Sequence, residues 1–218
     1  MGWAVIFSDR ADAGRRLAEA LHELRHDRPI IVGLPRGGVL VAAEVARSLR
    51  APLDVVLVRK LGAPDQPELA LGALGEDDVL IRNERLIRAA GLVPEEFAGL
   101  LDRAGAELAE RATRYRGECD ALAVAGRPVV VVDDGIATGA TARAACSVLR
   151  VRGATRIVVA VPVAPPGWEQ QFAQVADACV ALQTPRRFSA IGQWYEDFSQ
   201  STDDEVTAAL RAAAVPPS

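Results

Sequence analysis

Four consecutive valines followed by two aspartates constrain the fold of this chain more than any other feature. The valines occupy positions 129–132, and Asp133 and Asp134 come directly after them. An uninterrupted β-branched run of this length, with turn residues after it, predicts a strand buried on both faces of a parallel sheet. Residues 135–141 are rich in Gly, Ala and Thr, and a helix-like run starts at Ala142. The segment therefore predicts a strand, a loop and a helix in succession.

The end of this strand is also a predicted ligand site. In open parallel sheets, ligands bind at the carboxyl ends of the strands, and a helix N-terminus offers N–H groups and partial positive charge to a phosphate. Thr138 and Thr141 add hydroxyl donors, and Gly139 lets the backbone approach a ligand closely. The two carboxylates would repel a phosphate but suit hydroxyl groups or a hydrated cation. We therefore expect a ligand with a phosphate and a diol, such as a ribose 5-phosphate.

The thirteen residues 129–141 resemble the signature with which type I phosphoribosyltransferases bind phosphoribosyl pyrophosphate. The resemblance implies an enzyme that uses Mg²⁺, transfers the phosphoribosyl group to a nitrogenous base and releases pyrophosphate. It implies that Asp133 and Asp134 bind the ribose and the metal. The loop that it implies for the phosphate comprises Ala137, Thr138, Gly139, Ala140 and Thr141.

The signature departs from the family pattern at two positions. Gly135 stands where the family usually carries an aliphatic residue. Ala137 stands where hypoxanthine-guanine enzymes carry an aspartate and adenine enzymes carry an alanine. The loop therefore offers sugar-phosphate binding but no acid or base for the acceptor.

Apolar strand-like runs alternate with helix-like runs along the chain. Strands are predicted at 29–33, 53–59, 129–132, 156–163 and 177–182. Helices are predicted at 11–24, 39–49, 94–115, 142–152 and 167–176. Such alternation predicts an α/β fold with a parallel twisted sheet flanked by helices. With the resemblance, we expect one domain over residues 1–218. Its expected parts are a core at about 29–62 and 128–182, a flexible loop and helical insertion at about 63–117, and a small hood at about 183–201.

Two other strand ends carry basic residues that would face the same edge. Arg36, Gly37 and Gly38 follow the first strand, and a glycine-rich turn with a guanidinium suits an anion. The resemblance implies that this turn is the pyrophosphate loop, which often contains a cis peptide before its basic residue. Arg59 and Lys60, the only lysine in the chain, end the second strand. The resemblance implies contacts with pyrophosphate for this pair, and we expect both residues to be catalytic. A plain turn at Arg36 and a solvated strand end at Arg59 and Lys60 remain alternatives.

Two glutamates lie in the region 60–83, which we interpret as a mobile loop or hairpin. Glu68 and Glu76 are both candidates to close over the site, and Glu76 is the one assigned a catalytic role. Residues 185–198 resemble the base-binding hood of hypoxanthine-guanine enzymes. The resemblance implies that Phe188 stacks on a base and that Asp197 lies near the base edge or a metal. Ala164 replaces the purine-reading lysine of those enzymes, so hypoxanthine and guanine are disfavoured. Adenine, a pyrimidine or another heterocycle is expected instead, and Ala137 slightly favours adenine.

Composition argues against several other classes of protein. A net charge of −4 and a pI of about 5.3 argue against a nucleic-acid surface. The apolar runs are shorter than a membrane span requires. Three widely spaced cysteines predict free thiols and a cytoplasmic protein. The residues His22 to His26 fit the H-E-x-x-H zinc motif. However, both histidines lie off the leucine stripe of the predicted helix, so a solvent-facing turn is favoured.

Two classes of function remain open at this stage. The first is a phosphoribosyltransferase, and the second is a non-catalytic regulator that binds the same sugar phosphate or a nucleotide. Arg36, Arg59 and Lys60 favour transfer, because a sensor of mononucleotides needs no pyrophosphate site. The amphipathic helix at 94–115 suits the core or a partner subunit, so a homodimer is also an open expectation.

Overall fold

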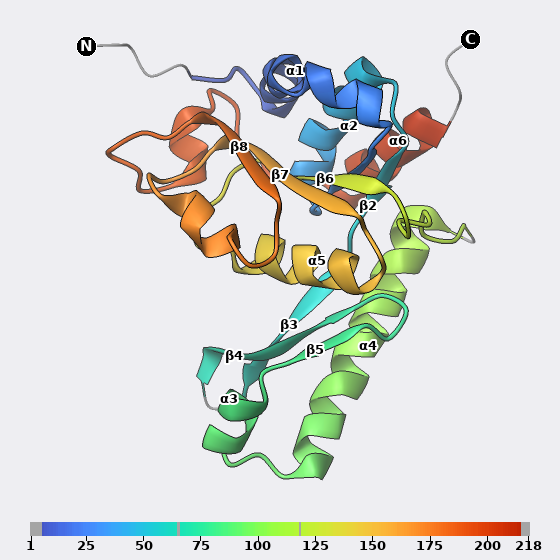
Figure 1. Cartoon of the computed structure of the whole chain (residues 1–218), viewed down its shortest axis with the longest axis vertical. Coiled ribbons are helices and arrows are strands. Elements are labelled where there is room, and N and C mark those ends of the chain that lie inside the picture. Colours follow the sequence, from blue (N-terminus) through green and yellow to red (C-terminus); the bar gives the residue numbers. More distant parts are fainter. Residues whose placement is uncertain (1–5, 65, 118, 215–218) are drawn as a thin grey trace.

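The computed structural model describes residues 6–64, 66–117 and 119–214, and its largest element is a five-stranded parallel sheet (Figure 1). The strand order is β2-β1-β6-β7-β8. These strands are β1 (Ile30–Gly33), β2 (Leu53–Val55), β6 (Pro128–Val132), β7 (Arg156–Val163) and β8 (Ala178–Gln183). The predicted α/β fold with a parallel sheet between helices is therefore confirmed.

Helices cover both faces of this sheet, and the valines of β6 are divided between the two faces. On one face lie α1 (Arg10–Ala20) and α2 (Gly37–Leu49), with α6 (Asp203–Ala214) beside α2 (Figure 1). On the other face lies α5 (Ala140–Val151) (Figure 1). Val129 and Val131 pack in the cluster that includes α5, while Val130 and Val132 pack with α1 and α2. Burial on both faces is what the valine run predicts.

The strand predicted at 53–59 is wrong in one respect, because the chain leaves the parallel sheet within it. β2 ends at Val55, and β3 (Val58–Ala63) belongs to a separate antiparallel sheet of order β3-β4-β5. Its other strands are β4 (Gln66–Gly75) and β5 (Leu80–Arg82). Residues 56 and 57, which connect the two sheets, are apolar and buried, so hydropathy alone does not reveal the break.

The small sheet and two helices form a unit that projects from the core (Figure 1). The helices are α3 (Glu84–Ala89) and the long α4 (Pro94–Arg116). The apolar face of α4, which includes Phe97, Ala104 and Leu108, packs on side chains of the small sheet. The hairpin interpretation of residues 60–83 therefore holds, and β5 adds a third strand to it.

The zinc motif lies outside any α-helix. α1 begins at Arg10, where the Asp9 carboxylate caps the helix by accepting a hydrogen bond from the Asp12 N–H at 2.7 Å. It ends at Ala20, however, and the 3₁₀ helix η1 (His22–Asp27) follows. Both histidines are exposed. In the described residues no group of three His, Cys, Asp or Glu is placed to hold a metal.

The remaining segments are short. The helix predicted at 167–176 is only the 3₁₀ helix η2 (Trp168–Phe172), and the irregular segment 183–201 contains the 3₁₀ helix η3 (Ile191–Trp194). Across the described ranges, no helix combines the length and the apolar character needed to span a membrane.

Candidate functional site

The two signature aspartates lie at the carboxyl end of β6, against the turn that follows β1. A Cβ atom added to Gly37 would overlap Asp134 Oδ2, and one added to Gly38 would lie 2.9 Å from Asp133 Oδ1. Only glycine fits at these two positions without a shift of the aspartates. The peptide bond between Pro35 and Arg36 is cis, as the resemblance implies. The structure thus brings together the two motifs that the sequence placed at one edge.

Asp134 is paired with a residue that sequence analysis missed. Arg10 Nε donates a hydrogen bond to Asp134 Oδ2 at 2.8 Å, and the two side chains are 11% and 14% exposed. Arg10 Nη1 donates to the Ser199 carbonyl at 2.8 Å, and the guanidinium lies 4.1 Å from the centroid of the Phe198 ring. Arg10 therefore links α1, the signature and the hood. No local pattern marks it, because 124 positions separate it from Asp134.

The surroundings of the aspartates favour a ligand with hydroxyl groups or a cation. Burial, and then the neighbouring Asp134 charge, raise the pKa of Asp133 well above its ordinary value. Burial also raises the pKa of Asp134, while Arg10 opposes that shift. The Asp134 N–H donates to Asp133 Oδ1 at 2.9 Å. Adjacent buried carboxylates repel each other unless donors or a cation offset their charge.

These aspartates fit Mg²⁺ held together with a substrate. Mg²⁺ is usually bound by one or two carboxylates, with waters and substrate phosphates completing its octahedron. Asp133 is the better placed of the two, because Asp134 already has Arg10 as a counter-ion. The donor set is therefore of the right chemistry for a cation that arrives with a phosphorylated ligand.

The loop after the aspartates leads directly into α5. Gly139 has a φ of 66°, a conformation that favours glycine, and Ala140 begins the helix. Thr138 and Thr141 are exposed. A Cβ atom on Gly139 would lie 3.1 Å from Phe172 Cζ, so Phe172 fills the inner side of the loop. The loop keeps accessible hydroxyls next to a helix N-terminus, as a phosphate site requires.

The unusual Gly135 has a structural counterpart in the hood. A Cβ atom at this position would lie 2.6 Å from Ile191 Cγ2 and 3.1 Å from Val163 Cγ1. The space that an aliphatic side chain would take is therefore filled by Ile191 of η3. Tyr195 Oη also donates to the Asp134 carbonyl at 2.6 Å, and burial raises the pKa of the Tyr195 hydroxyl. Sequence analysis predicted neither contact.

The two predicted base-binding residues occupy different surroundings. Phe188 is half-buried and packs against the hood cluster that contains Trp194 and Tyr195. Asp197 is exposed, and its carboxylate accepts a hydrogen bond from the Ser199 N–H at 2.9 Å, which lowers its pKa. Asp197 therefore lies on the surface of the hood.

Two of the three predicted pyrophosphate cations line cavities, and these cavities differ. Arg36 lines a cavity of about 520 Å³ beside α4 and α6. Arg59 pairs at 2.9 Å with Glu107, which lines the same cavity. Lys60 lines a separate cavity of about 770 Å³ between the small sheet and α5. Successive strand residues point to opposite faces, so β3 divides Arg59 from Lys60.

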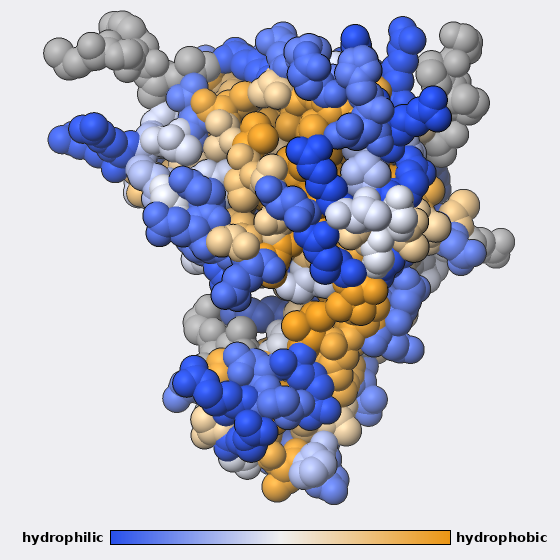
Figure 2. Space-filling view, viewed as in Figure 1, coloured by the Kyte–Doolittle hydropathy of each residue, from blue (hydrophilic) through white to orange (hydrophobic). Residues whose placement is uncertain are grey.

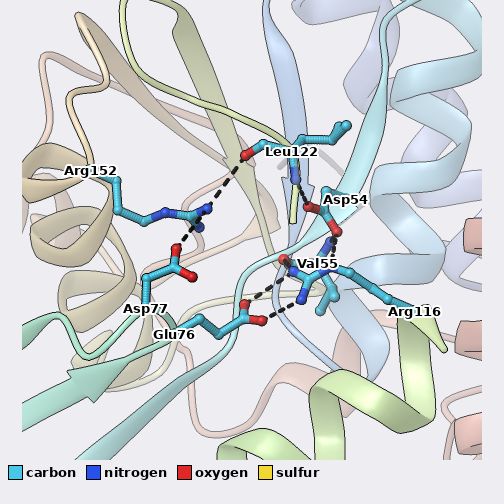
Figure 3. Close-up of polar contacts among 7 residues, drawn as sticks. All are labelled: Asp54, Val55, Glu76, Asp77, Arg116, Leu122 and Arg152. Carbon is cyan, nitrogen blue, oxygen red and sulfur yellow. Dashed lines mark hydrogen bonds and ion pairs between the residues drawn. The ribbon is translucent and has the colours of Figure 1, made fainter. Parts of the chain in front are cut away.

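Glu76 belongs to a buried ionic cluster and not to a mobile loop (Figure 3). Arg116 Nε donates to Asp54 Oδ1 at 2.7 Å, Nη2 donates to the Val55 carbonyl at 2.6 Å, and both η nitrogens contact the Glu76 carboxylate. The three charged side chains are 7–11% exposed. These surroundings do not favour the catalytic role predicted for Glu76. The side chain of Glu68 lies outside the described part.

Comparisons with known proteins agree with these motifs. Residues 5–179 match the family model described as the phosphoribosyl transferase domain. "Putative phosphoribosyl transferase Rv0571c" of Mycobacterium tuberculosis (strain ATCC 25618 / H37Rv) is 50% identical over 208 residues, which are 95% of this chain and 47% of that protein. The chain thus spans about half the length of this curated relative.

Two other comparisons bear on the site and the fold. The adenine phosphoribosyltransferase of Parasynechococcus marenigrum (strain WH8102) is 35% identical over 130 residues, covering 56% of this chain and 75% of that protein. The crystal structure of TT1426 from Thermus thermophilus superposes with a TM-score of 0.85 at 47% identity, covering 94% of this chain and 98% of that one.

Proposed function

Because the chain belongs to the type I phosphoribosyltransferase family, we propose that it transfers the phosphoribosyl group of phosphoribosyl pyrophosphate to a nitrogenous base, with Mg²⁺ and with release of pyrophosphate. The contact between two turns at one sheet edge is the observation that carries this proposal. Gly37 and Gly38 abut Asp134 and Asp133, and Arg36 is the next residue in the turn. This contact supports a site in which the carboxylates bind a ribose and the turn of Arg36 binds a diphosphate.

Each segment of the edge has a proposed role in binding this substrate. Asp133 and Asp134 bind the ribose hydroxyls and the metal, and the loop 137–141 holds the 5-phosphate. Arg36 with its two glycines binds pyrophosphate, and Arg10 holds Asp134 in place. Bound Mg²⁺ would neutralise charge on the departing pyrophosphate. The hood shields the electron-poor ribosyl carbon from water, which would otherwise compete with the base.

The proposed catalytic set is smaller than the sequence suggested. Arg59 remains in it because its partner Glu107 lines the cavity of Arg36. Lys60 remains in it because its cavity also includes Ala140 of the phosphate loop. We leave Glu76 out, since its carboxylate is engaged by Arg116.

For the acceptor, we propose adenine or another base without a 6-oxo group. Ala164 follows β7 where, by the resemblance, oxopurine enzymes carry a lysine. A site that lacks such a polar group gains little from a carbonyl on the base, so it selects 6-oxopurines only weakly over other bases. Ala137 and the relative named as an adenine enzyme support the same choice. Phe188 is proposed to stack on the base.

A panel of bases tests the proposal. Each base is incubated with phosphoribosyl pyrophosphate and Mg²⁺, and pyrophosphate release is measured. We expect one base to react, with guanine and hypoxanthine slower by about tenfold or more. Binding of phosphoribosyl pyrophosphate without turnover of any base would favour the non-catalytic regulator. Guanine turning over as fast as the best base would refute the acceptor proposal and leave the transfer intact.

Phe188→Ala tests the hood within the same assay. We expect it to raise the KM for the reactive base more than the KM for phosphoribosyl pyrophosphate, because the ring provides a stacking face only for the base. Ser189→Ala, a neighbouring exposed position, should change neither constant. An equal rise of both constants in Phe188→Ala would remove the ring from the base site.

We also propose that the protein forms a homodimer. On the face in Figure 2, apolar side chains remain visible along the projecting unit, where α4 and the small sheet lie. Val93, next to the start of α4, is 49% exposed. Sedimentation of the purified chain should therefore give twice the monomer mass, and a monomer at all concentrations would refute this part.

A further inference from the structure

The cavity that Arg36 lines has a second wall that sequence analysis could not interpret. Opposite the turn of Arg36, α4 contributes Arg111, Arg114 and Tyr115, and α6 contributes Asp203. The cavity measures about 520 Å³. It begins next to the signature, because the neighbouring residue Gly37 abuts Asp134. A ligand held by the signature aspartates can therefore extend into it.

The carboxylates of this cavity already have partners. Glu107 pairs with Arg59 at 2.9 Å. Glu110 and Asp203 both pair with Arg114, each at 2.6 Å. Asp203 also accepts a hydrogen bond from the Tyr115 hydroxyl at 2.7 Å. The three negative charges of the wall are therefore largely offset by Arg59 and Arg114.

The other two guanidinium groups of the cavity are less engaged, since Arg36 attracts the Asp203 carboxylate only at longer range and Arg111 contacts the Tyr115 hydroxyl. Among the residues that the structure describes, neither Arg36 nor Arg111 forms an ion pair with a carboxylate. Arg111 is half-buried and lies 5.8 Å from the centroid of the Tyr115 ring. Guanidinium groups bind phosphate oxygens through two parallel hydrogen bonds. Two guanidiniums that form no ion pair, and that line one cavity from the turn and from α4, fit an anion with two phosphate groups.

We propose that Arg111 of α4 is a pyrophosphate-binding residue that acts together with Arg36 across this cavity. The inference rests on the proposed function and adds to it. One phosphate lies at the turn of Arg36, and the other lies at α4. The ion pairs of Arg114 with Glu110 and Asp203 hold the α4 wall in place. The projecting unit thus contributes to the substrate site through its longest helix.

Binding of inorganic pyrophosphate, measured by calorimetry on the whole chain with Mg²⁺, tests the inference. Arg111→Gln should weaken binding by about tenfold or more, since a charge-assisted hydrogen bond is removed. Arg36→Gln should have a comparable effect. Arg103→Gln is the matched control, because Arg103 is exposed on the same helix and does not line the cavity. Its affinity should equal that of the wild type.

A second readout separates a binding role from a structural role. In Arg111→Gln, the affinity for ribose 5-phosphate should stay unchanged while the affinity for pyrophosphate falls. Arg111→Lys should recover part of the loss, because it keeps the charge but not the forked geometry. Equal losses for both ligands, or wild-type affinity in Arg111→Gln, would overturn the inference.

The results also distinguish this inference from the proposed function. Pyrophosphate binding that depends on Arg111, together with no transfer to any base, would refute the transferase and support the inference. A wild-type chain that does not bind pyrophosphate would refute the inference, whatever the transfer assay gives.

Discussion

Three glycines decide how the segments at the sheet edge pack together. Gly37 and Gly38 leave room for the aspartates, and Gly135 leaves room for Ile191. Three segments distant in sequence meet there at contact distance. A methyl group at any of these positions would separate them. The glycines therefore shape the site as much as the charged residues do.

Arg10→Gln tests the pairing of the signature aspartate. The substitution leaves the largely buried Asp134 carboxylate without its cation, and we expect a loss of about 2–3 kcal/mol in the free energy of unfolding. Urea unfolding measures this loss. Arg15→Gln is the control, since Arg15 is 52% exposed and 3.8 Å from Asp12. It should cost less than about 1 kcal/mol. Equal stability of the two variants would contradict the role given to Arg10.

Gly135→Ala tests the fit of the hood. The new methyl group would lie 2.6 Å from Ile191 Cγ2, and such overpacking costs about 1–3 kcal/mol. Adding Ile191→Ala should relieve part of that cost, so a double-mutant cycle should show coupling. Gly99→Ala on α4 would meet only Arg103 Nη1, at an ordinary 3.6 Å, and should be neutral or stabilising. Additive effects at 135 and 191 would disprove the contact.

At the scale of elements, the parallel strands were predictable and the exit from the sheet was not. A valine run buried on both faces has few other interpretations, and Pro94 marks the start of α4. The break between Val55 and Val58 leaves no trace in hydropathy, because the residues on both sides of it are apolar and buried. The motifs of the site were likewise visible in sequence. Arg10 was not, since it belongs to the site only through tertiary packing.

The buried cluster of Arg116 fastens the projecting unit to the core. Arg116 ends α4, while Asp54 lies on β2 and Glu76 follows β4 (Figure 3). Arg116→Met would leave two buried carboxylates without a cation, with an expected loss of about 3–5 kcal/mol. Urea unfolding would show it.

The matched control lies in the same region. Asp77→Asn removes the partner of Arg152, but Asp77 is 65% exposed, so its loss should stay below about 1 kcal/mol. A loss of the same small size in Arg116→Met would mean that the cluster contributes little to the attachment of the unit.

For the whole molecule, acid should weaken the link between β7 and the segment before β8. The Asp177 carboxylate accepts a hydrogen bond from the Ile157 N–H at 2.7 Å and pairs with Arg150, and both contacts lower its pKa from the ordinary 3.8. A carboxyl group whose pKa is lowered by folding stabilises the folded state at pH values above its ordinary pKa. This stabilisation is lost as the pH falls through the pKa of the folded state. The stability difference between wild type and Asp177→Asn should therefore shrink below about pH 4.

Urea midpoints at several pH values measure this difference. Asp102→Asn is the control, because Asp102 is exposed and forms no ion pair within the described ranges. The urea midpoint of Asp102→Asn should stay close to that of the wild type at every pH. If the stability difference between wild type and Asp177→Asn grew as the pH fell, the proposed role of Asp177 would be wrong.

The link between Arg10, Asp134 and Tyr195 has a consequence for synthesis on the ribosome. Arg10 emerges first, and its partner in the signature follows only after 124 further positions. Tyr195 emerges later still. At a synthesis rate of about 5–20 residues per second, roughly 10–40 seconds pass between the synthesis of Arg10 and that of Tyr195. During that interval, the nascent chain holds a guanidinium that has no partner, beside an apolar helix face that has no sheet. The contacts around Asp134 therefore form only after the segment that carries Tyr195 has been synthesised.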